Sequence, residues 1–283
     1  MITTATNHMI PELKKLWKLS FHDDNDYIDF YYENRFCDKE TIVYLIENQI
    51  AAMLTMMPGY VVHQNIKLPV SYVYAVATHP EYRRKGYAKA LLEYANLHFS
   101  KDNVGTFLVP ATPSLFPYYE MLGYQLVSNK KLLHTDVDTY LQSVEKQVLA
   151  THLKMEQLTV QEYYQYRACA YNEAGYVMWD ERALNYLMRE FQFVGGYASK
   201  VVIDQEEGAV LYYVNDDTLI IKETTLSDRN IFTVVNYLKE QMNFSNITIH
   251  LPKTSLLPGE SIPYVMSYGG GFIGGEYVNL VLD

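Results

Sequence analysis

The sequence predicts an α/β protein with a mixed sheet, built as two domains in tandem. Its 283 residues are more than one compact core usually organises, and two domains of roughly 140 residues fit the common size range. Helical and extended patterns alternate along the first half, and the same order recurs more loosely in the second. We therefore expect domains over 1–138 and 156–283, joined by a linking segment over 139–155.

Apolar periodicity and turn residues assign the elements of the first half. Leu13, Leu16 and Trp17 follow helical spacing after Pro11, a residue suited to a first turn. Glu47-Asn48-Gln49 is a polar turn between two runs rich in β-forming residues. The expected helices are 10–21, 26–36, 86–99 and about 113–122, and the expected strands are 41–47, 50–57, about 59–67, 71–77, 104–109, 124–127 and near 131–137.

The second half carries similar signals in a similar order. Its glycine-rich run, 269–276, is expected to be a flexible turn, because it does not open a helix as a phosphate loop does. The expected helices are 159–170, 180–191 and 229–242, and the expected strands are 198–204, 208–214, 217–224, 245–251, 264–268 and 276–282.

Composition excludes several classes of protein. The formal charge of 23 − 33 = −10 argues against a nucleic-acid partner, which needs a broad basic surface. No apolar stretch is long enough to cross a bilayer, and the N-terminus lacks signal-peptide features. With only Cys37 and Cys169 there is no disulfide framework, and we expect no metal site. We expect a cytoplasmic protein without a membrane partner, and a homo-oligomer is compatible with the sequence.

A local cluster of positive charge stands out in this acidic chain. Residues 51–100 hold five bases and two acids, and four of the five bases lie between Arg83 and Lys89. The pattern around them predicts a strand, a tight turn ended by Gly86, and a helix whose first turn has no acid. The first N–H groups of a helix lack internal partners and favour an anion. Gly86 and Ala88 let the backbone approach that anion closely.

This segment resembles the signature of the GNAT superfamily of N-acetyltransferases, Gln/Arg-x-x-Gly-x-Gly/Ala, met here by Arg83, Gly86 and Ala88. The preceding 79–83, His-Pro-Glu-Tyr-Arg, is also typical of that family. The resemblance implies acetyl-CoA as acyl donor, with its diphosphate on amides 84–89 and its pantetheine arm paired with a bulged strand. The cofactor-binding residues so implied are Val76, Ala77, Thr78, Arg83, Arg84, Lys85, Gly86, Tyr87, Ala88 and Lys89.

The resemblance also suggests a general acid. Residues 116–124 look like the family's Phe-Tyr-x-x-x-Gly-Phe segment, whose tyrosine often lies beside the thioester sulfur. By that register Tyr119 protonates the departing thiolate, and Tyr118 takes the place of a packing aromatic. The alternative is that both tyrosines are packing groups on a helix face.

The general base stays open. Asp23, Asp24, Asp26, Glu33 and His22 lie in the segment that borders the acceptor slot in GNAT folds. As a group, these residues favour a cationic acceptor by charge complementarity. The expected contacts to the acceptor are Asp23, Asp24 and Asp26. A solvated acidic loop, with Asp24 or Asp26 capping a helix, is an equally good interpretation.

The two-domain order resembles the enhanced-intracellular-survival group of GNAT proteins. That likeness implies a second, degenerate GNAT-like domain, because 229–251 lack an Arg-x-x-Gly pattern and should not bind CoA. Members of the group add a third domain that this sequence is expected to lack. We therefore do not expect a role for the Asp283 carboxylate, or the aminoglycoside acetylation for which the group is known. Asp26, by contrast, matches an acidic position near the acceptor in that group.

The function predicted is transfer of an acetyl group from acetyl-CoA to a primary amine of a small cationic molecule or peptide. The alternative is a CoA-sensing or partner-binding protein with vestigial catalysis. A longer acyl donor is also open, although Tyr74, Leu108 and Phe116 would narrow the acyl pocket if they do not belong to the core.

Overall fold

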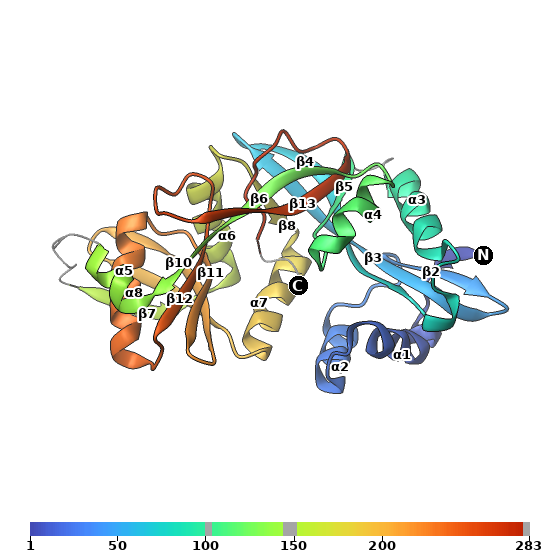
Figure 1. Ribbon diagram of the computed structural model, residues 1–283, viewed down its shortest axis with the longest axis horizontal. Helices are drawn as coiled ribbons and strands as arrows, with labels where there is room; N and C mark the ends of the chain where they lie inside the picture. The colour runs from blue at the N-terminus through green and yellow to red at the C-terminus, as the bar shows by residue number, and fades with distance from the viewer. Residues whose placement is uncertain (100–103, 144–151, 280–283) are drawn as a thin grey trace.

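A computed structural model describes residues 1–99, 104–143 and 152–279 (Figure 1). The helices are α1 (Ile10–Phe21), α2 (Asn25–Asn34), α3 (Tyr87–Phe99), α4 (Phe116–Glu120), α5 (Val137–Ser143), α6 (Val160–Tyr171), α7 (Glu181–Phe193) and α8 (Asp228–Gln241), with 3-10 turns η1 (Asn7–Met9), η2 (Pro80–Tyr82) and η3 (Pro113–Leu115). The strands are β1 (Ile2–Thr4), β2 (Thr41–Ile46), β3 (Gln49–His63), β4 (Ile66–Thr78), β5 (Gly105–Leu108), β6 (Gln125–Asp136), β7 (Leu153–Gln157), β8 (Tyr176–Trp179), β9 (Tyr197–Ile203), β10 (Glu206–Asn215), β11 (Thr218–Thr224), β12 (Asn246–Leu251) and β13 (Glu260–Gly269).

These strands form one 13-stranded mixed sheet, which confirms the predicted α/β class. Its order is β1-β2-β3-β4-β5-β13-β6-β12-β11-β10-β9-β7, and β8 pairs with β3. Figure 1 shows β6 and β13 crossing the middle of the molecule, with α1, α2 and α3 at one end and α5 and α8 at the other.

The sheet is organised alike from both ends toward its centre. On one side β4 pairs in parallel with β5, and α3 connects them; on the other, β11 pairs in parallel with β12, and α8 connects them. The remaining pairs along the main path are antiparallel on both sides. The loose repeat in the sequence therefore corresponds to a repeated strand–helix–strand unit.

The two halves of the chain exchange strands at the centre. β13, from the second half, lies between β5 and β6, so that Met266 faces Leu108 on one side and Leu126 on the other. β6, from the first half, pairs in turn with β12. The sheet is thus continuous across the domain boundary expected at 138, and that boundary stays a prediction.

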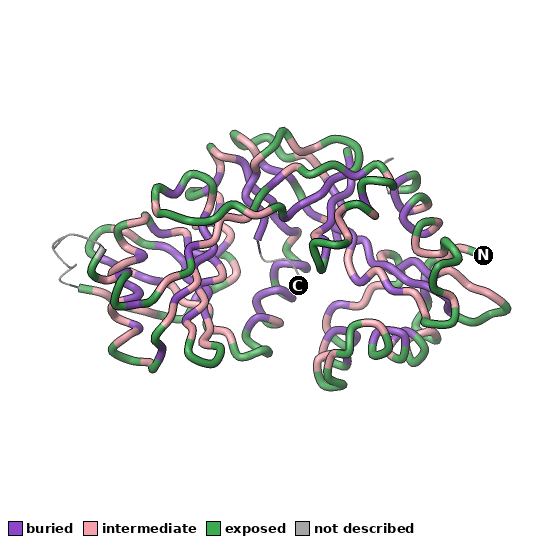
Figure 2. The backbone as a smooth tube through the Cα atoms, in the orientation of Figure 1, coloured by how far each residue is buried: buried purple, intermediate pink, exposed green. Residues whose placement is uncertain are grey.

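Buried residues run along the strands of this sheet (Figure 2), and their apolar side chains gather in clusters. Trp17 and Tyr31 of the first half share one buried cluster with Trp179 and Tyr186 of the second. A cluster on the other face joins α3 and α4 to β3 and β4 and includes Tyr119. The halves therefore share packing as well as hydrogen bonds.

Some predicted boundaries are wrong. The segments expected at 50–57 and 59–67 are one strand, β3, which continues through Pro58 and Gly59. Gly59 lets β8 approach β3 closely at this point, because a Cβ there would lie 3.3 Å from the Met178 carbonyl of β8. The turn falls instead at Gln64 and Asn65, both with positive φ.

The strands expected at 124–127 and 131–137 are likewise one strand, β6, because β12 and β13 pair with it along its length. In place of one helix over 113–122, the structure has a 3-10 turn, η3, followed by the short helix α4. Local pattern did not predict β1, β7 or β8. The expected linking segment, 139–155, overlaps the end of α5 and the start of β7. Residues 144–151 of that segment, and 280–282 of the last expected strand, lie outside the described residues.

Candidate active site

The parallel ladder between β4 and β5 ends where the resemblance implies the pantetheine arm, and β4 continues beyond it. The last pair of their parallel ladder is Tyr72 with Phe107, whereas β4 continues to Thr78. A bulge lies just beyond, because Thr55 of β3 faces Tyr74 and Met53 faces Ala77. Ala75, within the bulge, has a φ of 51°. The expected bulge is present, and a bulge bends its strand locally, so the edge of Val76–Thr78 lies beyond the ladder with β5.

The loop over 79–86 connects the end of β4 to α3 and is fastened to the sheet at its base. Arg83 Nε donates a hydrogen bond to the Thr78 carbonyl at 3.1 Å. The Tyr82 hydroxyl donates to Gln49 Oε1 of β3 at 3.2 Å. Both contacts return the loop toward the strand end, so the amides that follow are held at the mouth of the parted strands.

Gly86 brings the chain into α3 through a conformation that favours glycine. Its φ is 85°, two residues after Arg84, whose φ is 62°. The Ala90 N–H donates to the Gly86 carbonyl at 2.9 Å and closes the first turn, so the amides before it precede the first bond within the helix. A Cβ built on Gly86 meets no atom of the described residues within 4 Å. The helix start is therefore open to an incoming group, and no acidic side chain lies in the first turn.

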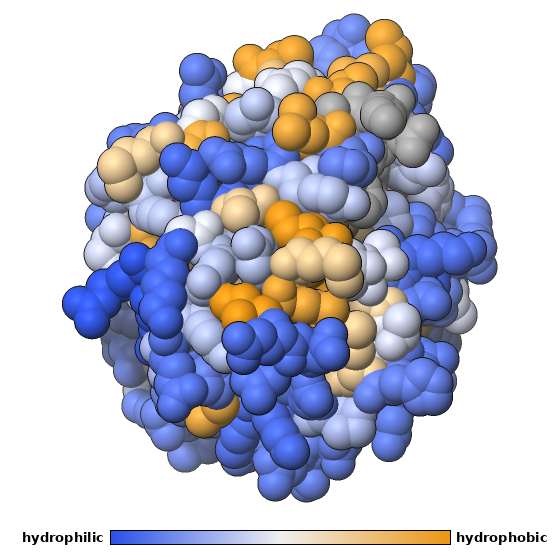
Figure 3. Space-filling model, turned by 90° about the vertical axis from the view of Figure 1, so that its right-hand side faces the viewer, coloured by the Kyte–Doolittle hydropathy of each residue, from blue (hydrophilic) through white to orange (hydrophobic). Residues whose placement is uncertain are grey.

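The positive side chains of the loop surround this helix start. Arg83, Arg84, Lys85 and Lys89 are all exposed. The Lys85 ammonium lies 5.2 Å from the centre of the Tyr82 ring, and Lys89 forms an ion pair with Glu93 at 3.7 Å. The charges therefore stay at the surface. Figure 3 shows the end of the molecule that carries the N-terminal half, where hydrophilic groups dominate and apolar ones form small separate patches.

Tyr119 lies on α4, against the place where the strands part. Its side chain is 8% exposed and belongs to the same buried cluster as Val73 and Leu108, which immediately follow the last residues of the parallel ladder. Burial, reinforced by Tyr118 and Tyr124, raises the pKa of Tyr119 above the ordinary value of 10.0. The Tyr119 hydroxyl thus stays protonated at neutral pH, as a proton donor must.

Neighbouring tyrosines have other surroundings. Tyr118 is half-buried, and its ring lies 5.3 Å from that of Tyr119. Tyr124 is buried, and its hydroxyl donates to Asn96 Oδ1 at 3.1 Å, an oxygen that Thr106 also bonds. Tyr124 therefore ties α3 to β5 as a packing group.

The acidic segment divides into one engaged and several exposed groups. Asp23 accepts a hydrogen bond from the Trp17 indole at 2.7 Å. Asp24 occupies the N-cap position of α2 without a side-chain bond to the helix, and Asp26 is exposed in its first turn. Glu33 and His22 are also exposed. Of these five residues, Asp23 is the one whose side chain bonds an aromatic residue of the core, Trp17.

One acidic residue on this side of the site has no signal in the local sequence. Glu190 of α7 lies near Tyr27 of α2, and its negative charge is the second cause, after burial, of the raised pKa of Tyr27. No local signal could have indicated this, because more than 160 residues separate Glu190 from Tyr27 in the chain.

The groups expected to narrow the acyl pocket differ in burial. Leu108 is buried and belongs to the core, whereas Tyr74 and Phe116 are half-buried. Leu108 and Phe116 belong to the cluster around Tyr119, and Tyr74 packs on the opposite face of the sheet with Trp17.

A bulged strand, a basic loop and a helix with an open start follow one another here, in the order that the resemblance to an acyltransferase predicts. Comparison with known proteins identifies the family. Residues 1–127 match the model of the acetyltransferase (GNAT) domain, and this part of the chain belongs to the GNAT family of N-acetyltransferases. The family typically uses acetyl-CoA, and nothing in the match identifies the acceptor.

Solved structures share the fold over nearly the whole chain. A conserved protein from Enterococcus faecalis, described as a probable N-acyltransferase, is similar with a TM-score of 0.77 at 14% identity, over 95% of this chain and 72% of that one. A GCN5-related N-acetyltransferase from Anabaena variabilis has a TM-score of 0.73 at 18% identity, over 94% of this chain and 72% of that one. Eis1 from Mycobacterium abscessus has a TM-score of 0.71 at 10% identity, over 95% of this chain and 73% of that one. No curated protein matched the chain. Within the described residues, no helix has the length and apolar character needed to span a membrane.

Proposed function

We propose that the first half of the chain transfers an acetyl group from acetyl-CoA to a primary amine of a small cationic molecule or peptide. The observation that carries the proposal is the end of the ladder between β4 and β5 at Tyr72, beyond which β4 continues through a bulge to Thr78, followed by the open start of α3 at Gly86. The open edge of Val76–Thr78 suits the amides of a pantetheine arm, and the amides of 84–89 suit a diphosphate.

The reaction supported by this arrangement is direct attack of the amine on the thioester. Bound acetyl-CoA supplies an activated acyl group. As the new C–N bond forms and the C–S bond breaks, the Tyr119 hydroxyl gives its proton to the departing sulfur, and the amine loses one. Tyr119 suits this role because its side chain lies at the mouth of the parted strands and remains protonated.

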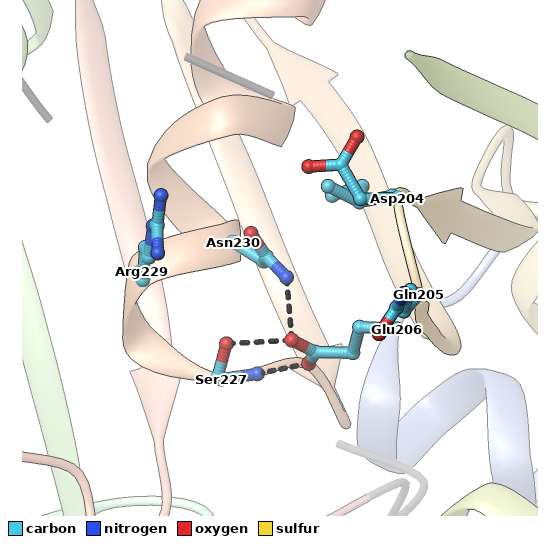
Figure 4. Close-up of a pocket in the computed structure, with 7 residues that line it drawn as sticks. Asp204, Gln205, Glu206, Ser227, Arg229 and Asn230 are labelled. Carbon is cyan, nitrogen blue, oxygen red and sulfur yellow. Dashed lines mark hydrogen bonds between the residues drawn. The ribbon is translucent and has the colours of Figure 1, made fainter. Parts of the chain in front are cut away.

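We further infer that the second half is a degenerate copy of the GNAT domain. Its β11-α8-β12 unit corresponds to β4-α3-β5, but only 225–227 connect β11 to α8, against 79–86 in the first half. The place of an anion at the start of α8 is taken by a carboxylate of the chain itself. Glu206 accepts bonds from the Ser227 amide at 2.7 Å, the Ser227 hydroxyl at 2.8 Å and the Asn230 side chain (Figure 4).

The counterpart of the pantetheine edge is occupied as well. β11 has a bulge at Lys222, just past its last pair with β12, Ile221 with Ile249. The Asn279 side chain donates to the Lys222 carbonyl and to the Tyr277 hydroxyl. Tyr277, Val278 and Asn279 are buried. With both parts of the corresponding site filled by the chain, the second half is not expected to bind CoA.

The self-capping of α8 predicts a loss of stability on removing Glu206. Glu206→Ala removes the acceptor of the Ser227 amide and hydroxyl and of the Asn230 side chain at the start of α8, and is expected to lower the free energy of unfolding by about 1–3 kcal/mol. Urea denaturation measures this. The control is Glu240→Ala, an exposed carboxylate near the other end of α8, where negative charge is unfavourable. Equal effects of both changes would contradict the capping role.

Calorimetric titration with CoA tests the assignment of the two halves. We expect one CoA per chain, with binding abolished by changes at Gly86 and retained in Glu206→Ala. Two sites per chain would contradict the degenerate second half, and no binding would overturn the whole proposal. Release of thiol from acetyl-CoA is then measured across a panel of amines. Binding without acceptor-dependent release would favour a CoA-sensing protein.

A further inference from the structure

An aromatic cluster with one carboxylate lies where α2, β4 and α7 meet. Tyr27 of α2, Tyr74 of β4 and Glu190 of α7 are half-buried, so a ligand can reach them from solvent. Trp17 and Tyr31 form the buried wall behind them, with ring centres 5.8 and 6.0 Å from that of Tyr74. The cluster lies at the bulge of β4, because Tyr74 precedes Ala75, and it occupies the face of the sheet opposite Tyr119.

The second half of the chain holds α7 firmly against α2. The Arg182 guanidinium donates to the carbonyls of Arg35 and Phe36 at 2.9 and 3.0 Å. Arg189 donates to Asn34 Oδ1 at 2.8 Å, and the ring of Phe193 stacks on Phe30 with centres 4.3 Å apart. These contacts flank Glu190 along the helix and fix where its carboxylate lies.

The groups of the cluster act on one another electrostatically. Burial and the charge of Glu190 raise the pKa of Tyr27, and burial, Tyr27 and Glu190 raise that of Tyr186. The tyrosine hydroxyls thus stay neutral beside the negatively charged Glu190. Nearby Asp23 adds to the negative charge that Tyr27 experiences.

A buried polar group in the cluster also lacks a well-formed hydrogen bond. Tyr186 is 3% exposed, and among the described residues its hydroxyl has no partner within hydrogen-bond distance, although the Tyr27 hydroxyl lies close enough to affect its pKa. Its ring lies 5.9 Å from that of Tyr31, perpendicular to it. An unsatisfied buried hydroxyl is costly unless a water or ligand bonds it, so the cluster is suited to a ligand with a hydrogen-bond donor.

We propose that Tyr27, Tyr74, Tyr186 and Glu190 form the acceptor subsite, which binds an alkylammonium group of the acceptor. The aromatic faces attract a cation, Glu190 neutralises it, and the Tyr186 hydroxyl accepts one of its N–H bonds. The inference rests on the proposed acetyl transfer and adds that the second half, through α7, selects the substrate.

Two acceptors of equal length test the subsite: 1,4-diaminobutane, which carries a second ammonium group, and butylamine, which does not. We expect Glu190→Gln to lower kcat/KM for the diamine about tenfold, to change butylamine little, and to leave the KM for acetyl-CoA within twofold. Glu181→Gln, on the same helix but exposed, should match the unaltered protein. A lysine-containing peptide in parallel distinguishes a peptide source of the cation from a free polyamine.

Direct calorimetry of 1,4-diaminobutane, with CoA present, separates failure of the subsite from failure of acetyl transfer. Binding that Glu190→Gln weakens, without turnover in any variant, would support the subsite and contradict the transfer reaction. Glu190→Asp should recover part of the affinity, because it restores the charge on a shorter side chain. Equal affinity in Glu190→Gln and the unaltered protein, or equal losses for both amines, would overturn the subsite.

Discussion

Gly86→Asp is expected to weaken CoA binding by at least about 100-fold while the protein remains folded. The substitution places a negative charge at the open start of α3, where the diphosphate is proposed to lie, and like charges brought together cost several kcal/mol. Each 1.4 kcal/mol corresponds to a tenfold change in affinity. Calorimetric titration with CoA measures the effect.

The chain offers a matched control in Gly195. Both glycines have φ near 90°, 85° for Gly86 and 90° for Gly195, and a Cβ on either meets none of the described residues within 4 Å. Gly195→Asp therefore imposes a similar backbone strain, about 1–2 kcal/mol for an L-residue in the left-handed region, and the same charge. Similar thermal stabilities with CoA affinity lost only in Gly86→Asp are expected; unchanged affinity would remove the loop from the cofactor site.

Tyr119→Phe is expected to lower kcat by about 10²–10⁴-fold, the usual contribution of a positioned proton donor. The phenyl ring keeps the packing of the cluster, so affinity for acetyl-CoA should stay within twofold. Steady-state kinetics with a fixed amine, together with CoA titration, measure both quantities. Tyr118→Phe is the control, because it removes a hydroxyl from the neighbouring ring.

The pH dependence adds a second test of Tyr119. A raised pKa keeps the donor protonated at every pH below 10, and the acid form is lost only above it. Because Tyr119 stays protonated over this range, we expect no loss of kcat from its deprotonation in the unaltered protein between pH 7 and 9. A kcat unchanged in Tyr119→Phe would leave Tyr119 as a packing residue, the alternative that the sequence also allowed.

Local features predicted the strand, loop and helix at the proposed cofactor end of the site. Arg83, Gly86 and Ala88 lie within six residues, and the conformation of such a short segment depends mainly on neighbouring residues. The left-handed φ of Gly86 and the helix that follows are properties of that local sequence. The roles of individual bases were less predictable, because Arg83 also bonds the carbonyl of Thr78 and Lys89 pairs with Glu93.

The acceptor end was predicted only in its charge. Asp24 and Asp26 remain exposed, and the acidic group that faces the tyrosines is Glu190, far along the chain. Likewise, the pattern of 131–137 indicates a strand but not that β12 and β13 flank it. Strand partners depend on which edges meet in the folded chain, and period-two alternation does not encode that choice.

By itself, the sequence determined the α/β class, the order of most helices and strands, and the strand–loop–helix with its glycine. Each of these depends on residues within one or two turns of each other. Only the tertiary structure decided the exchange of β6 and β13, the bonds of Glu206 at the start of α8 and of Asn279 at the bulge of β11, and the meeting of Glu190 with Tyr27. Those contacts join residues that lie from about 20 to more than 160 positions apart, and packing of the complete sheet brings them together.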